Sequence, residues 1–156
     1  MKHVISILME NRPGVLRRIS GLFDRRGYNV DSIVASATEI ESRTRMTIVV
    51  DGDEQILQQV IKQLLKLQEI IEVENVTHQP VISRQLLLMK LNATYETRID
   101  IIQLADAFGA RIVDIKADSI IIEATAENDV TQSIIETFEP YGIQSLMKTG
   151  TVALKK

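Results

Sequence analysis

The feature that most constrains the fold is an order of strands and helices that occurs twice along the 156 residues. In each half, an apolar run is followed by an amphipathic helix, two strands joined by a polar hairpin, a second helix and a further strand. This βαββαβ order predicts a ferredoxin-like unit, in which two helices cover one face of a four-stranded antiparallel sheet. We therefore expect an α+β protein made of two ferredoxin-like units.

The expected elements follow from apolar periodicity and from the Gly, Pro and capping residues at their ends. The first unit is predicted to contain strands at about 3–9, 30–39, 45–50 and 70–77 and helices at about 14–26 and 54–67. The second is predicted to contain strands at about 84–92, 111–116, 120–126 and 143–147, helices at about 97–108 and from 128, and a short strand at 151–154. Pro80 cannot lie in a central strand, so we expect a domain at 1–78, a linker at 79–83 and a second domain at 84–156.

Two of the predicted strands are apolar on both faces. Ile5–Met9 and Leu86–Met89 show little of the alternation that a sheet with one solvated face requires. Strands buried on both faces imply a second layer, supplied by the other half of the chain or by another subunit. We therefore expect an oligomer, with a homodimer as the simplest form.

Composition narrows the classes of function. The net charge of −3 gives no reason to expect nucleic acid or an anionic membrane as a partner, and the 4% aromatic content argues against a stacking platform for single strands. The chain has no cysteine, which excludes disulfides and thiolate metal sites and fits the cytoplasm. The apolar run near the N-terminus is too short for a signal or a membrane span.

Few side chains suggest catalysis or metal binding. His3 and His78 are the only histidines, and no cluster of carboxylates accompanies them in the sequence. Ser6 lies in a predicted strand without a nucleophile elbow. We therefore expect no catalytic residue and no metal ligand in this chain.

A turn between the first strand and the first helix is the best candidate for a ligand site. Asn11, Pro13 and Gly14 are typical turn residues, and the helix that follows ends at Gly27. The start of a helix carries unpaired N–H groups and partial positive charge, so it attracts a carboxylate. Gly14 leaves room for a ligand, and the Asn11 amide can both donate and accept hydrogen bonds. The alternative is a plain strand-to-helix turn, and the sequence leaves both open.

The same residues resemble a known family. The stretches 10–16 and 27–30, ENRPGVL and GYNV, are similar to the ACT domain of the acetolactate synthase (acetohydroxyacid synthase) regulatory small subunits. Residues 45–48, 111–115 and 148–154 resemble the later strands of that family, so the similarity covers nearly the whole chain. The resemblance implies that the first of the two ferredoxin-like units is an ACT domain.

The resemblance also implies a function without chemistry of its own. Small subunits of this family bind a large catalytic subunit, which holds thiamine diphosphate, Mg²⁺ and FAD, and no cofactor is expected in this chain. They raise the activity of that subunit and make it sensitive to valine or related branched-chain amino acids. The positions that match the family's effector site are Asn11 and Gly14 of one subunit and Asn29 of its neighbour. Candidates for the apolar wall, each equally well explained as core, are Val15, Leu16, Val30 and Ile33.

Two other functions are compatible with the same fold. One is a stand-alone ACT-domain sensor of amino acids that regulates another enzyme or transcription. The other is an enzyme similar to acylphosphatase, which needs an arginine in the first turn, where Arg12 lies. An anion cradle also needs consecutive free N–H groups, and Pro13 removes one of them.

Overall fold

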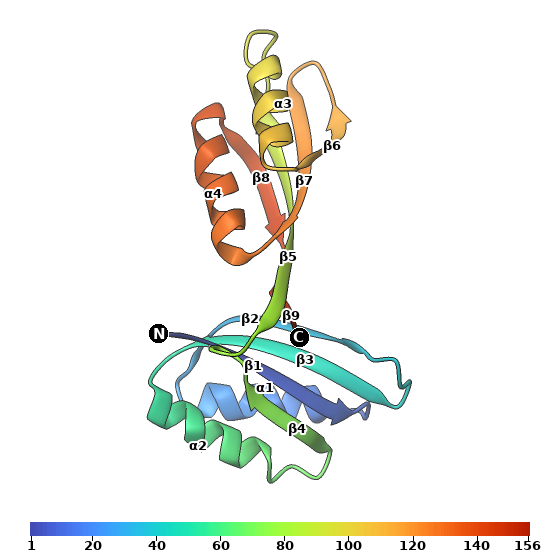
Figure 1. Cartoon of the computed structure of the whole chain (residues 1–156), viewed down its shortest axis with the longest axis vertical. Helices are drawn as coiled ribbons and strands as arrows, with labels where there is room; N and C mark the ends of the chain where they lie inside the picture. The colour runs from blue at the N-terminus through green and yellow to red at the C-terminus, as the bar shows by residue number, and fades with distance from the viewer. The chain divides into compact units, whose positions relative to one another are not determined.

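The computed structural model describes all 156 residues, which form two compact units (Figure 1). The first unit consists of residues 1–82 and 150–156, and the second of residues 83–149. Each unit has the βαββαβ order and an antiparallel sheet, with the strand orders β2-β3-β1-β4 and β6-β7-β5-β8. The prediction of an α+β protein with two ferredoxin-like units is confirmed.

The elements of the first unit are β1 (Lys2–Glu10), α1 (Val15–Arg25), β2 (Asn29–Ala37), β3 (Arg43–Asp51), α2 (Glu54–Leu64), β4 (Ile70–Asn75) and, after the second unit, β9 (Val152–Lys155). Strand β5 (Val81–Asn92) begins in the first unit and continues into the second. The remaining elements of the second unit are α3 (Arg98–Ala107), β6 (Arg111–Ile115), β7 (Ser119–Ala126), α4 (Asn128–Phe138), the 3₁₀ turn η1 (Glu139–Tyr141) and β8 (Ile143–Lys148).

The core of the first unit lies between its sheet and its two helices. Every second residue of β1, from His3 to Met9, is buried on the helix-facing side. Ile19 and Phe23 of α1 and Leu57 of α2 pack against this face and are fully buried. The period of two in the strand and the helical spacing in α1 therefore meet in one apolar layer, as amphipathic elements require.

The division between the units differs from the predicted one in two places. Strand β5 begins at Val81, inside the expected linker at 79–83, because Pro80 precedes the strand and does not interrupt it. Residues 150–156 belong to the first unit and not to the expected domain at 84–156. Strand β9 pairs with β5, and the backbone N–H of Lys156 donates to the carbonyl of Pro80 at 3.0 Å.

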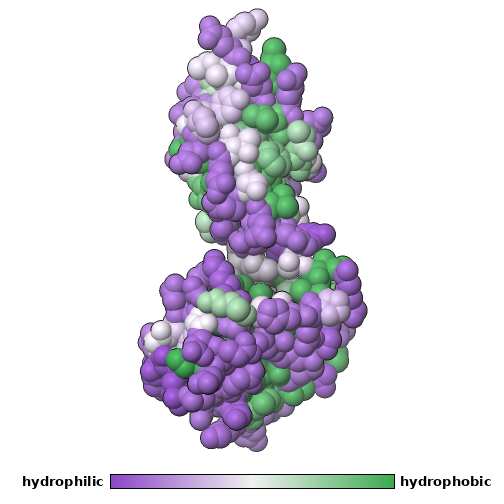
Figure 2. Space-filling view, turned by 60° about the vertical axis from the view of Figure 1, so that its left-hand side comes forward, coloured by the Kyte–Doolittle hydropathy of each residue, from purple (hydrophilic) through white to green (hydrophobic).

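The two strands that were apolar on both faces differ in how their outer faces are covered. The outer residues of β1, such as Ser6 and Leu8, are half-buried on the face where residues 150–156 lie. Leu86 and Leu88 of β5 are exposed by 37% and 39%. Figure 2 shows hydrophobic side chains among the hydrophilic ones on the molecular surface.

None of the helices has the length and apolarity that crossing a membrane requires.

Candidate functional site

The turn between β1 and α1 is held at both sides by backbone hydrogen bonds. The N–H of Asn11 donates to the carbonyl of Ser42 at 2.8 Å, and the N–H of Glu10 donates to the carbonyl of Glu69 at 2.8 Å. The side chain of Asn11 and the whole of Gly14 are exposed. The backbone of the turn is therefore fixed, while the groups predicted to contact a ligand face solvent.

Gly14 begins α1 in a conformation that favours glycine. Its φ is +84°, in the left-handed region that side chains other than glycine seldom adopt. No side chain caps the start of α1, and its first turn contains no acidic residue. The orphan N–H groups of this helix start are thus free of a carboxylate from the chain itself, which is the state an anionic ligand needs.

Asn29 lies at the opposite end of the sheet from this turn. It begins β2, in the same row of the sheet as Asp51 and Lys2, whereas Asn11 follows the last residue of β1. Strand β1 has nine residues, which span about 27 Å at about 3.4 Å per residue. One chain by itself therefore cannot bring Asn11 and Asn29 to the same small ligand.

The candidates for the apolar wall fall into different environments. Val30 and Ile33 line a surface hollow of about 390 Å³ between α1 and β2, and Ile33 is 37% exposed. Val15 is 1% exposed and belongs to the core, while Leu16 is 50% exposed and does not line the hollow. The structure thus brings together two of the four predicted apolar residues.

Four further residues line the same hollow and were not predicted from the sequence. They are Ser20, Gly21, Asp24 and Tyr28. One signal in the sequence was available, because a glycine inside a helix costs about 1 kcal/mol relative to alanine and needs a reason. A Cβ on Gly21 would meet no atom of this chain within 4 Å, so nothing in the chain itself requires the glycine.

A buried carboxylate helps to hold the turn between β1 and α1 in place. Glu69, which is 8% exposed, forms an ion pair with the Arg18 guanidinium, which α1 places one turn after its start. Its carbonyl accepts the hydrogen bond from Glu10 described above, so Glu69 ties both β1 and α1 to the start of β4. The backbone amide of Glu69, and then the hydrogen bond and charge of Arg18, lower the pKa of the Glu69 carboxyl, and burial opposes them.

The lowered pKa predicts a pH dependence of stability. Because the folded state favours the ionised carboxylate, Glu69 contributes stability above the ordinary glutamate pKa of about 4.3 and loses it as the pH falls through its folded-state pKa. We expect Glu69→Gln to lower the free energy of unfolding at pH 7 and to have a smaller effect near pH 3. Denaturant unfolding at both pH values measures this, with Glu72→Gln on β4 as the exposed control. An equal effect of Glu69→Gln at both pH values would contradict the ion-pair contribution.

The structure argues against a function of the turn similar to that of acylphosphatase. The Arg12 guanidinium, which such an enzyme needs for its substrate, is paired with the carboxylate of Glu10 at 2.9 Å. Pro13 follows it and has no N–H to donate.

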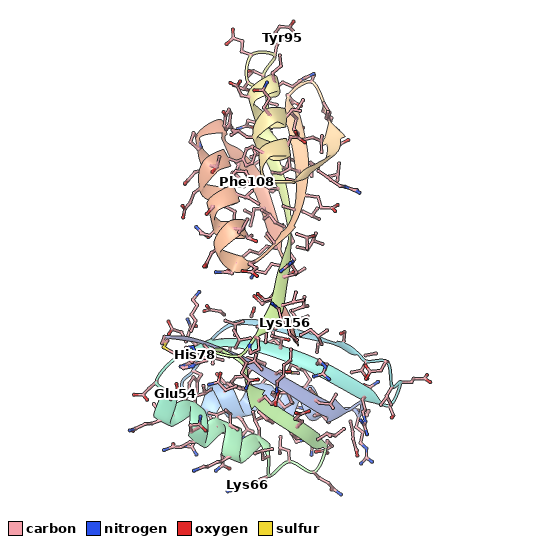
Figure 3. The ribbon with its side chains drawn as sticks, viewed as in Figure 1. Glu54, Lys66, His78, Tyr95, Phe108 and Lys156 are labelled. Atoms are coloured by element: carbon pink, nitrogen blue, oxygen red, sulfur yellow. The ribbon has the colours of Figure 1, made fainter.

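The two histidines are not part of the turn. His3 is 1% exposed and its Nε2 lies 3.2 Å from the carbonyl of Gly52. His78 is exposed in the segment between β4 and β5 (Figure 3). No group of three or more His, Cys, Asp or Glu residues is arranged to hold a metal ion.

The first unit is thus a ferredoxin-like unit whose first helix opens at a glycine turn, the form that the resemblance to an ACT domain implied. Its residues 5–72 match the family model described as the AHAS small subunit-like ACT domain. Residues 84–156 match the model described as the small subunit of acetolactate synthase.

Several known proteins are similar to this chain over nearly its full length. The chain is 47% identical to the probable acetolactate synthase small subunit of Archaeoglobus fulgidus, over 99% of this chain and 96% of the relative. It is 39% identical to the acetolactate synthase small subunit of Mycolicibacterium smegmatis, over 99% of this chain and 91% of the relative. The crystal structure of the acetolactate synthase small subunit from Thermotoga maritima superposes with a TM-score of 0.89 at 30% identity and covers 100% of this chain and 98% of that one. The chain belongs to the acetolactate synthase small-subunit family.

Proposed function

We propose that this chain is the non-catalytic regulatory subunit of an acetolactate synthase in the cytoplasm. It binds the large catalytic subunit, raises its activity and makes it sensitive to valine or a related branched-chain amino acid. Thiamine diphosphate, Mg²⁺ and FAD belong to that large subunit. The observation that carries the proposal is the uncapped start of α1 at Gly14, beside Asn11, in a chain related over its full length to acetolactate synthase small subunits.

The chemistry of the turn supports an amino acid as effector. The orphan N–H groups at the start of α1 suit its carboxylate, and an asparagine amide oxygen suits its ammonium group. The apolar hollow lined by Val30 and Ile33 suits a small aliphatic side chain. The turn thus has groups for the two charged ends of an amino acid, and the hollow, nearer the Asn29 end of β2, has room for an aliphatic side chain.

A second copy of the chain completes the site. Strand β2 is an edge strand, so two β2 strands can pair in antiparallel fashion about a two-fold axis. This pairing places Asn29 of the partner subunit at the sheet end that carries Asn11. It also covers the α1 face on which Gly21 and the hollow lie, which gives the unused space at Gly21 a purpose.

The proposal predicts a dimer that depends on this face. We expect the isolated protein to sediment as a dimer or larger at micromolar concentration, and Gly21→Glu to give folded monomers with no measurable valine binding. Glutamate favours helix over glycine, so α1 remains intact while a charge is placed beside Asp24 and its symmetry mate. Sedimentation, circular dichroism and calorimetry measure the three properties.

Gln58→Glu, which adds the same charge on the exposed face of α2, is the matched control. It should leave the dimer and valine binding unchanged. A concentration-independent monomer for the unaltered protein would exclude the shared site.

Reconstitution tests the function itself. We expect the catalytic large subunit to gain activity when this chain is added, and the added activity to fall when valine is titrated in. A control with the large subunit alone identifies any inhibition that does not need this chain. If the full chain binds valine but neither binds nor activates the large subunit, the protein is a stand-alone sensor.

A further inference from the structure

Residues 150–156, here named the crossing segment, run over the sheet face that the helices leave open. Gly150 lies against Ser32 and Val34 of β2, at one edge of the sheet. Lys155 forms an ion pair with Glu74 of β4, at the other edge, with Nζ and Oε1 3.0 Å apart. The five steps from Gly150 to Lys155 cover about 17 Å, and the three spacings between four strands cover about 14 Å. The crossing segment therefore has the length needed to pass over all four strands.

Burial on this face supports the same path. Thr47 and Val49 of β3 lie on the outer side of the sheet and are 4% and 9% exposed, although neither belongs to the helix-side core. Thr151 and Ala153 of the crossing segment are each 8% exposed. Ser6 of β1 and Ala153 line one small hollow between the sheet and the segment. The crossing segment is thus packed onto the sheet and is part of the first unit.

The packing is closest where the segment meets β2. A Cβ added to Gly150 would lie 2.6 Å from Cγ2 of Val34, closer than such atoms approach, and 3.0 Å from Cβ of Ser32, tighter than most such contacts. The φ of Gly150 is not positive, so the glycine is required by this contact and not by its backbone conformation. Because no free space separates Gly150 from β2, a displacement of β2 must displace Gly150 or break the contact.

Strand β2 is also the strand that carries the candidate effector residues. Asn29 begins it, and Val30 and Ile33 line the hollow on its helix side, while Ser32 and Val34 point to the opposite face. One strand thus carries effector contacts on one face and the contact with Gly150 on the other.

Gly150 is also the first residue after the second unit. Thr149 is tied to β5 by two hydrogen bonds: its N–H donates to the carbonyl of Leu86 at 2.9 Å, and its Oγ1 accepts from the N–H of Leu86 at 3.0 Å. Movement of Gly150 therefore acts through one peptide bond on a residue that is held firmly in the second unit.

We propose that the contact of Gly150 with Ser32 and Val34 transmits the effect of effector binding from β2 to the second unit. This inference rests on the proposed function, because it assigns the route by which the same effector site controls the catalytic subunit. The element with two states is the crossing segment, packed on β2 or displaced from it, and both the effector and the second unit bias its position.

The test separates effector binding from its consequence. The full-length Gly150→Ala variant is reconstituted with the catalytic subunit, valine binding to the small subunit is measured by calorimetry, and inhibition of the holoenzyme by valine is measured in parallel. We expect Gly150→Ala to bind valine but to shift the half-inhibiting concentration, or to reduce the extent of inhibition, by about fivefold or more, the lower end of typical coupling between sites. Val34→Ala, added to Gly150→Ala, removes the methyl group that the new Cβ meets, and we expect it to restore inhibition.

Val152→Ala is the matched control, because it changes a half-exposed residue of the same segment and leaves Gly150 as it is. Unchanged inhibition in Gly150→Ala, with valine binding intact, would overturn the coupling and leave the proposed function standing. No valine binding to the unaltered protein would overturn the proposed function and the coupling with it. If Gly150→Ala does not fold, hydrogen exchange of residues 151–155 in the unaltered protein decides: we expect valine to change their protection, and identical exchange with and without valine overturns the coupling.

Discussion

Gly14→Asp is expected to give an active holoenzyme that no longer responds to valine. Aspartate at the start of α1 occupies the space proposed for the effector and places a second negative charge beside the effector carboxylate. At about 4 Å this repulsion is about 1 kcal/mol in water and about 4 kcal/mol at an effective dielectric constant near 20. Since 1.4 kcal/mol is about tenfold in affinity, even the smaller repulsion lowers valine affinity about fivefold, and with the space that aspartate occupies we expect a fall of at least about tenfold. Calorimetry and the valine inhibition curve measure the change.

The conformation of Gly14 determines the controls for this variant. At φ +84° any side chain carries strain of roughly 1–2 kcal/mol, so Gly14→Asp also loses some stability. Gly14→Asn has the same shape and the same strain without the charge, and the difference between the two variants reports the charge. Gly109→Asp, at φ +68° with open space around it, places the same strain and charge in the second unit and should leave valine inhibition unchanged. An unaltered inhibition curve for Gly14→Asp would show that the turn has only a structural role.

Mixing two variants that each bind valine weakly is expected to restore tight valine binding. Asn11→Ala and Asn29→Ala should each lose a hydrogen bond to a charged group of the effector, which is typically worth about 1.5–3 kcal/mol, or about 10- to 100-fold in affinity. In a mixed dimer, one site combines Asn11 of the Asn29→Ala subunit with Asn29 of the Asn11→Ala subunit and is intact. The other site lacks both amides.

Equal mixing with free exchange gives about half mixed dimers, so about one quarter of all sites should bind valine with normal affinity. Calorimetry of the mixture, compared with each variant alone, measures the restored fraction. The distance along β1 between the two asparagines is the reason for this expectation, because a site built within one chain could not be restored by mixing. A mixture that binds no better than its components would exclude the shared site.

The sequence by itself determined the order of the elements and the local geometry at their ends. Apolar periods of two and 3.6 residues identify strands and helices without knowledge of their neighbours. Gly27 was predicted to end α1, and it has φ +69° just after the helix. Asp53 lies just before α2 and caps it, since its carboxylate accepts the N–H of Gln55 at 2.7 Å. These features depend on residues close together in the chain, which is why a sequence pattern reveals them.

Only the tertiary structure decided which surfaces meet. Strand β1 was predicted to need a second layer, but the periodicity of a strand shows that a face is covered and not what covers it. The pairing of Glu69 with Arg18, 51 positions apart, and the packing of Gly150 on Val34 leave no local pattern in the sequence. The candidate site follows the same division. Asn11 and Gly14 were recognisable because they lie together in one turn, whereas the hollow formed by α1 and β2 and the position of Asn29 at the far end of the sheet depend on how the strands pair.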